Sequence, residues 1–265
     1  SKGGGTFMHP IIDAHIHLDM YTEAERDKIL KEMKQDNVDA LICVSNHLTS
    51  AEKVLELHQH DQRRIKPAIG YHPEQKLPTD AELSKLIQLI HQYQKEIVAV
   101  GEVGLPFYER QKNPGLDRKP YIEVLEIFIK EAARLDKPVV LHAVYDDAPV
   151  VCDLLEKHNH KRAHFHWFKG DAKTSKRMVA NNYFISITPD CLYEKEIQQL
   201  VETYPIEQIM VETDGPWPFE GPFQHHLTHP AMIHQSIRKI AKLKQLSLDT
   251  TYQQLYQNTK SFYSI

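Results

Sequence analysis

Ile11-Ile12-Asp13-Ala14-His15-Ile16-His17-Leu18-Asp19 is the stretch of sequence from which the fold can be inferred. The apolar run after Pro10 fits a β-strand, because it is too short to show a helical period. Alternate side chains of a strand point to one face, so His15 and His17 are expected to lie together. Two imidazoles held in this way suit a divalent metal. The alternative is ordinary hydrogen bonding at a strand end, since so short a motif also occurs by chance.

Seven further segments have the composition of buried strands, and helical patterns separate them. The expected strands after the first are 38–44, 65–71, 97–102, 138–142, 162–166, 183–187 and 208–212. Strands that alternate with helices indicate βαβ units and a parallel sheet. Eight such units in a chain of 265 residues favour a closed barrel over an open doubly wound sheet. We therefore predict an α/β protein with a (β/α)8, or TIM-barrel, fold in a single domain.

The helices expected between the strands follow the periodicity of their apolar residues. They include 22–36, 50–60, 120–135, 147–158, 172–181 and 194–203, and helices 229–244 and 249–262 close the chain. Residues 107–119 are polar and rich in proline and glycine, so we expect a loop there. It is longer than most loops of its kind, and long loops on compact domains are often functional.

Composition excludes several classes of protein. The formal net charge of −4 gives no overall attraction to nucleic acid or to an anionic membrane. Cys43, Cys152 and Cys191 are widely spaced and contain no CxxC pair, which fits a reducing, cytoplasmic compartment. No membrane helix or signal peptide is evident in the sequence. We expect residues 1–8 to be an expression remnant with the N-terminus, and residues 9–265 to be the barrel domain.

Six polar residues stand at the predicted carboxyl ends of strands, where barrels of this kind have their active sites. They are His15, His17, Glu102, His142, His166 and Asp214. Any one of them alone could simply be a solvated polar residue at a strand end. Six on one rim, however, are more ligands than a single tetrahedral ion requires. A carboxylate that bridges two ions would use them all, which favours a two-metal hydrolytic site. Ligation rich in histidine favours zinc or manganese, although iron, nickel and magnesium are not distinguished.

Six motifs in order resemble the TatD-type metal-dependent hydrolases, which are relatives of the amidohydrolase superfamily. They are Asp13-x-His15-x-His17-Leu18-Asp19, Gly70-Tyr71-His72-Pro73, Gly101-Glu102-Val103-Gly104-Leu105, Val140-Leu141-His142, His166-Trp167-Phe168-Lys169-Gly170 and Glu212-Thr213-Asp214. The resemblance implies a TIM barrel with one to three divalent ions that hydrolyses phosphodiesters, typically as a deoxyribonuclease. It also implies two sets of ligands, namely His15, His17, Glu102 and Asp214 for one ion, and Glu102, His142 and His166 for a second.

The chain departs from the family pattern where phosphate contacts are expected. Pro106 stands where the family usually has aspartate, and Val144 stands where an arginine is common. Residues 215–235 contain no lysine or arginine, although the family tends to be basic there, and they hold four histidines instead. These departures concern the substrate more than the type of reaction.

Three further polar residues lie two positions before a proposed ligand, so they are expected to point inward one layer deeper. Asp13, His164 and Glu212 would then fix imidazole tautomers or orient carboxylates. The alternative for each is a buried polar residue with no effect on a metal.

Substrate contacts are expected from His72, Lys169 and Trp217 on the rim. His72 would touch the substrate or cap the turn before Pro73, and Lys169 would meet a phosphate or stay solvated. Trp217 would stack on a base or sugar, or pack its loop against the barrel mouth.

The sequence therefore predicts a hydrolase that acts on ester bonds through metal-activated water. Asp214 would accept or orient the proton of that water, and Glu102 would be the second catalytic residue. The expected substrate is DNA, cleaved at ends or in single strands, or a small phosphodiester. The alternatives are a small-molecule phosphoesterase, a lactonase-type amidohydrolase, and a metal-binding protein without turnover. No membrane association and no stable protein partner are expected.

Overall fold

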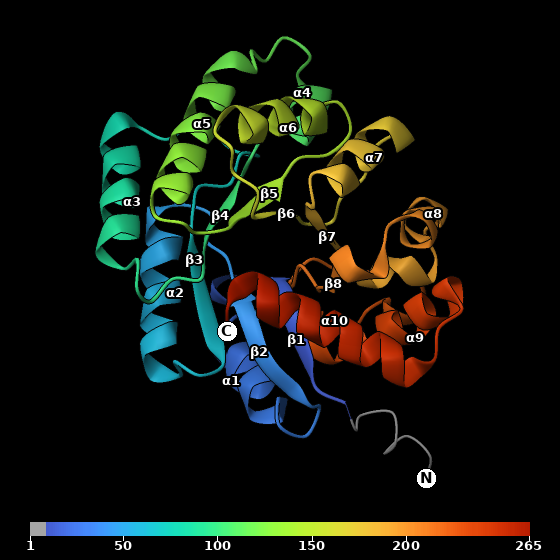
Figure 1. Cartoon of the computed structure of the whole chain (residues 1–265). Coiled ribbons are helices and arrows are strands. Elements are labelled where there is room, and N and C mark those ends of the chain that lie inside the picture. Colours follow the sequence, from blue (N-terminus) through green and yellow to red (C-terminus); the bar gives the residue numbers. More distant parts are fainter. Residues whose placement is uncertain (1–8) are drawn as a thin grey trace.

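Eight parallel strands form one sheet in the order of the sequence, from β1 to β8 (Figure 1). The computed structural model describes residues 9–265, so the expectation for residues 1–8 lies outside the described part of the chain. The strands are β1 (Ile11–Ile16), β2 (Val38–Cys43), β3 (Ile65–Ile69), β4 (Ala99–Gly104), β5 (Val139–His142), β6 (Ala163–Phe165), β7 (Phe184–Ile187) and β8 (Ile209–Val211). The predicted α/β class is confirmed.

Two backbone hydrogen bonds bring the last strand back to the first. The N–H of Asp214 donates to the carbonyl of His15 at 2.9 Å, and the N–H of His17 donates to the carbonyl of Gly215 at 2.8 Å. The sheet is therefore a nearly closed barrel, and the predicted TIM-barrel fold in a single domain is confirmed.

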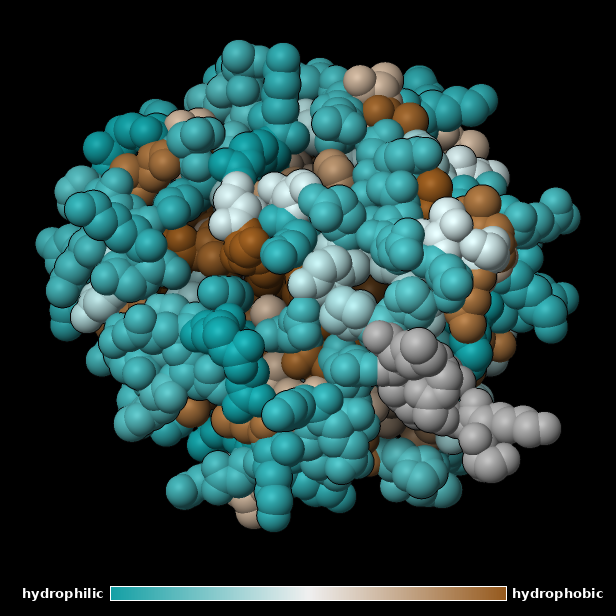
Figure 2. Space-filling model, turned by 60° about the horizontal axis from the view of Figure 1, so that its bottom comes forward, coloured by the Kyte–Doolittle hydropathy of each residue, from teal (hydrophilic) through white to brown (hydrophobic). Residues whose placement is uncertain are grey.

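Helices cover the outside of the strands (Figure 1). They are α1 (Glu23–Glu32), α2 (Leu48–His60), α3 (Asp80–Gln92), α4 (Phe107–Lys112), α5 (Lys119–Arg134), α6 (Asp147–Lys157), α7 (Ala172–Ala180), α8 (Lys195–Thr203), α9 (Ile233–Lys244) and α10 (Leu248–Tyr263). No helix within residues 9–265 is long and apolar enough to cross a membrane. Hydrophilic side chains cover most of the face in Figure 2, and hydrophobic ones show only in small areas.

Two helical predictions need correction. The helix expected over residues 22–36 is shorter: Thr22 caps it in a reciprocal pair with Glu25, and it ends at Glu32. Asn37 then takes a φ of +55°, which turns the chain into β2. The loop expected over residues 107–119 contains a short helix, α4, because the carboxylate of Glu74 accepts hydrogen bonds from two N–H groups of its first turn.

The floor of the barrel is closed by the C-terminus of α10. Phe262 and Tyr263 pack with residues from the N-terminal halves of several strands, among them Ile12, Ala40 and Met210. The barrel interior is thus filled at its N-terminal end, and polar side chains gather at the opposite end.

Gly104 allows β4 to approach β5 beside the proposed metal ligand His142. A Cβ atom at position 104 would lie 1.9 Å from the carbonyl oxygen of His142, and Gly104 has a φ of +158°. Only glycine fits this position, which explains the second glycine of the Gly-Glu-Val-Gly motif.

Candidate metal centre

Four side chains from three strand ends meet at the mouth of the barrel, around the carboxylate of Glu102. His15 lies in β1 with His17 just after it, Glu102 lies in β4, and Asp214 follows β8. Oε1 of Glu102 lies 3.1 Å from Nε2 of His15 and 3.2 Å from Nε2 of His17. Oδ1 of Asp214 lies 3.3 Å and 3.2 Å from the same two nitrogens. The structure thus brings together four of the proposed ligands.

The spacing of these donor atoms fits one divalent ion. Ligands at about 2.0–2.1 Å from a tetrahedral ion lie about 3.4 Å from one another. The separations observed here are 3.1–3.3 Å. Oδ1 of Asp214 and Oε2 of Glu102 are buried and make no well-aligned hydrogen bond. A buried oxygen without a well-aligned hydrogen bond is costly, and bound cations would satisfy both.

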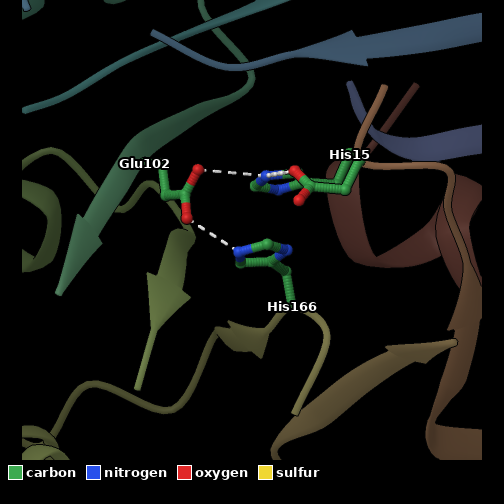
Figure 3. Close-up of side chains that lie close together, drawn as sticks. His15, Glu102 and His166 are labelled. Carbon is green, nitrogen blue, oxygen red and sulfur yellow. Dashed lines mark hydrogen bonds and ion pairs between the residues drawn. The ribbon is translucent and has the colours of Figure 1, made fainter. Parts of the chain in front are cut away.

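The second oxygen of Glu102 faces another pair of imidazoles. Nε2 of His166 lies 2.7 Å from Oε2 of Glu102, and Nε2 of His72 lies 3.3 Å from it. The rings of His15 and His166 stack with their centroids 3.6 Å apart. Glu102 therefore directs one oxygen to each of these two rings (Figure 3). A carboxylate in this position is suited to bridging two ions.

His142 is directed to a carboxylate that the sequence did not single out. Its Nε2 lies 2.7 Å from Oε2 of Glu74, and the two carboxylate oxygens of Glu74 also accept hydrogen bonds from the N–H groups of Tyr108 and Glu109 in α4. The ring centroids of His142 and His166 are 6.1 Å apart. Ligation of a second ion by His142 stays a prediction, and it requires Nε2 to exchange Glu74 for the ion or Glu74 to join the ligands.

Opposite charges in contact shift the pKa values of these groups. Burial works to lower the pKa of His17, but Asp214 and Glu102 outweigh it and raise the pKa to about 10. Burial likewise opposes a charge on His166, yet Glu102 and Glu212 raise its pKa well above the ordinary value. Burial would raise the pKa of Glu102, but the imidazoles, His166 first, hold it well below its usual range. A cation that binds these nitrogens must displace their protons.

Glu212 and His164 occupy the layer below the ligands. Oε1 of Glu212 lies 3.1 Å from Nδ1 of His166, and Oε2 accepts the N–H of Trp167 at 3.0 Å. Glu212 is thus placed to orient His166, as proposed. His164 is buried at the same depth and hydrogen-bonds to Ser186 at 2.6 Å.

Asp13 accepts hydrogen bonds from the backbone of His15 and from Thr213, rather than from an imidazole ring. Its carboxylate accepts the N–H and the hydroxyl of Thr213 at 3.0 and 2.6 Å, and the N–H of His15 at 3.1 Å. Burial raises its pKa to about 7, although these hydrogen bonds act in the opposite direction. Asp13 therefore fixes the chain on both sides of the centre, next to His15 and to Asp214.

A cavity of about 1190 Å³ opens above the centre. Outside the centre, its walls carry six carboxylates and two lysines; the carboxylates belong to Glu74, Glu109, Asp190, Glu194, Glu196 and Glu220. Nζ of Lys169 lies 3.1 Å from the hydroxyl of Tyr108 and 4.7 Å from the ring centre of Trp167. Trp217 meets the edge of Trp167 and is 57% exposed. The predicted substrate residues Lys169 and Trp217 therefore line the cavity.

The histidines of residues 215–235 lie apart from the centre. His225 and His226 are exposed, and Nε2 of His229 lies 3.2 Å from Oε1 of Glu32 in α1. His234 is buried, and its Nε2 lies 2.7 Å from the carbonyl oxygen of Asp36. These contacts connect the segment to α1 and the turn after it.

Comparisons with known proteins agree with this arrangement. The family model for TatD-related DNase matches residues 12–264. An uncharacterized metal-dependent hydrolase of Haemophilus influenzae is 38% identical over 96% of this chain and its own full length. The human deoxyribonuclease TATDN3 is 30% identical over 94% of this chain and 92% of its own. The crystal structure of the TatD homolog YjjV from Escherichia coli K12 superposes with a TM-score of 0.86 at 25% identity, covering 96% of this chain and 98% of YjjV. The chain therefore belongs to the TatD-related DNase family of metal-dependent hydrolases.

Proposed function

We propose that this protein hydrolyses phosphodiester bonds of DNA, at strand ends or in single strands, with two divalent ions. The observation that carries the proposal is the position of Glu102, with one oxygen toward His15 and His17 and the other toward His166. The name of the human relative, deoxyribonuclease TATDN3, supports DNA as the substrate.

The contacts support five of the residues that would hold the ions, and the sixth, His142, comes from the family resemblance. His15, His17, Glu102 and Asp214 would hold the first, and Glu102, His166 and His142 the second. Divalent ions bound in this way lower the pKa of a coordinated water and polarise a phosphoryl oxygen. The histidine and carboxylate donors suit zinc or manganese.

Asp214 would accept the proton of the attacking water. Its carboxylate is ionised, because hydrogen bonds from His15 and His17 outweigh burial and hold its pKa below the ordinary value. The side chain of Asp214 is 12% exposed at the mouth of the barrel, so its carboxylate would reach the attacking water while Oδ1 faces the first ion.

His72 would donate a hydrogen bond to the substrate. Its Nδ1 accepts the N–H of Glu74 at 3.0 Å, so a neutral ring carries its proton on Nε2. Nε2 points toward Glu102, with 3.3 Å between it and Oε2. An Nε2–H in that position suits a phosphoryl oxygen and does not suit a metal ion, which fits the role predicted for His72.

The cavity walls favour a short substrate over a long duplex. Six carboxylates repel a polyanion, and the cavity has two lysines to oppose them. Lys112 points to solvent with 76% of its side chain exposed, and it lies 3.9 Å from Glu109. Lys169 would meet one phosphate near the metals, and Trp217 would stack on a terminal base.

A substrate panel separates the candidate functions. Protein stripped with a chelator is reloaded with zinc, manganese or magnesium and offered a phosphodiester, a phosphomonoester, a lactone and a single-stranded oligonucleotide. We expect cleavage of the phosphodiester and the oligonucleotide, and loss of both activities after stripping. Cleavage of the lactone or phosphomonoester alone would replace this proposal with one of the small-molecule alternatives. Tight metal binding without turnover on any substrate would support a non-catalytic role. The cytoplasmic location stays a prediction.

A further inference from the structure

A line of buried polar side chains runs through the barrel from its floor to the metal centre. The hydroxyl of Tyr263, near the end of α10, lies 2.6 Å from Nδ1 of His164. Nε2 of His164 lies 2.6 Å from Oγ of Ser186 in β7. The hydroxyl of Ser186 donates to Oε2 of Glu212, whose Oε1 lies 3.1 Å from Nδ1 of His166. Each of the five residues is at most 4% exposed.

The donor and the acceptor in every hydrogen bond of this line follow from the carboxylate of Glu212, next to His166. A carboxylate only accepts, so Glu212 receives the single hydroxyl proton of Ser186 and the Nδ1–H of His166. Because that proton of Ser186 is used, Oγ must accept from Nε2–H of His164. His164 is fully buried and both of its ring nitrogens face hydroxyl groups, so a charged ring would have no carboxylate to pair with; the ring is therefore neutral and Nδ1 has no proton. Nδ1 of His164 therefore accepts from the hydroxyl of Tyr263.

The same order leaves Nε2 of His166 as the nitrogen that can ligate a cation, once the cation displaces the proton between Nε2 and Glu102. His166 has its proton on Nδ1, held by Glu212, and its Nε2 faces Oε2 of Glu102 at 2.7 Å. If the proton of Ser186 turned toward His164 instead, the oxygens of Ser186 and Glu212 would face each other with no proton between them. Nδ1 of His164 would then carry a proton directed at Tyr263.

The backbone around His166 depends on the same carboxylate. Trp167 takes a φ of +42°, which is unfavourable for a large side chain, and its N–H donates to Oε2 of Glu212 at 3.0 Å. Glu212 thus holds both the ring of His166 and the turn that follows it. The residues that fix Glu212 also fix the position of His166.

We propose that Tyr263, His164 and Ser186 are positioning residues, which through Glu212 hold His166 in the tautomer that ligates the second ion. The inference rests on the proposed role of His166 as a ligand, and it makes the C-terminal helix part of the metal centre. Outer residues that orient a metal-binding imidazole typically change metal affinity by about 10–100-fold. Tyr263 is the most remote member, so we expect the lower end of that range for its loss.

The first test reads the tautomers directly. Long-range proton–nitrogen NMR of ¹⁵N-histidine protein, without substrate, assigns each ring proton. We expect a neutral His164 with its proton on Nε2, and His166 with its proton on Nδ1 once zinc is added. A proton on Nδ1 of His164 in the wild-type protein would overturn the proposal.

The second test compares two tyrosines of the same helix. Tyr263→Phe removes the hydroxyl at the floor, whereas Tyr256→Phe removes a hydroxyl that donates to Asp39 at the surface at 2.6 Å. We expect Tyr263→Phe to lower the affinity for the second zinc ion by roughly tenfold and to leave Nδ1 of His164 without its hydrogen-bond donor. Ser186→Ala interrupts the line nearer to the centre, and it should lower the affinity for that ion at least as much. Equal zinc affinity in Tyr263→Phe and Tyr256→Phe would refute the role of the tyrosine.

These readouts are independent of turnover. A protein that shows the predicted tautomers and affinities but cleaves no phosphodiester would contradict the proposed function alone. One that cleaves DNA while Tyr263→Phe and Ser186→Ala bind zinc as the wild type does would contradict only the positioning role.

Discussion

Replacing Asp214 with asparagine removes the proposed proton acceptor with little change of shape. Oδ1 of Asp214 lies 3.3 Å from Nε2 of His15 and 3.2 Å from Nε2 of His17. Asp214 has a φ of +53°, a left-handed conformation that asparagine also tolerates, so the fold should be retained. Asparagine keeps an oxygen that can face a cation but cannot accept a proton at neutral pH. Turnover should fall by roughly 10²–10⁴, or about 3–5 kcal/mol of transition-state stabilisation.

The assay for this variant separates catalysis from metal binding and from folding. Turnover is measured on an end-labelled single-stranded oligonucleotide at saturating metal, with metal content and thermal unfolding measured on the same samples. Asp39→Asn is the matched control, because Asp39 is an exposed carboxylate of β2 bonded to Tyr256. Turnover of Asp214→Asn within a few-fold of the wild type, with its metals bound, would show that Asp214 is not the proton acceptor.

The other predictions concern metal content, pH and substrate affinity. The double variant His15→Ala and His17→Ala should lose the first ion, whereas His142→Ala should mainly affect the second. Metal analysis checks both, and full wild-type stoichiometry in the double variant would contradict the assignment. Burial raises the pKa of Asp190 from 3.8 to about 6, against hydrogen bonds that lower it, so the folded state favours its protonated form. Its contribution to stability should therefore be lost as the pH rises from about 4 to above 6, by roughly 3 kcal/mol. The free energies of unfolding of the wild type and Asp190→Asn, measured with urea across this range, should differ by an amount that changes with pH. A difference that stays constant would contradict this prediction. Trp217→Ala should raise KM for an oligonucleotide several-fold with little change in kcat, and an unchanged KM would place Trp217 outside the substrate site.

Convergence of the central residues could be predicted because it follows from the barrel. His15, His17, Glu102 and Asp214 stand at or just beyond strand ends, and the carboxyl ends of parallel strands in a barrel share one rim. The register of β1 against β2 shifts between Asp13 and Ile16, yet both imidazoles still reach Glu102. The alternation of side chains along the strands was therefore sufficient to predict that these residues meet.

The contacts of His142 could not be predicted in the same way. Glu74 lies in the loop after β3, and its position depends on the N–H groups of α4, which the sequence suggested to be a loop. Pro106 precedes this segment and Pro114-Gly115 follows it. These residues indicated a loop, so the one and a half helical turns between them were not predicted. The only local signal for Glu74 was a carboxylate two residues after His72.

Part of the buried line of polar residues below the centre could be predicted from the sequence. Ser186 stands on β7 two residues after Phe184, so strand alternation directs it into the barrel. Tyr263 gave no such signal, because its place depends on how α10 packs across the floor.

Cleavage of DNA across a salt series shows whether the protein acts at strand ends and in single strands. The substrates are end-labelled single-stranded and duplex oligonucleotides and a closed circular duplex, with protein loaded with zinc or manganese. We expect cleavage at ends or within single strands, with a shallow salt dependence equivalent to about one or two phosphate contacts. Rapid internal cutting of the closed circle, with a steep salt dependence, would contradict it.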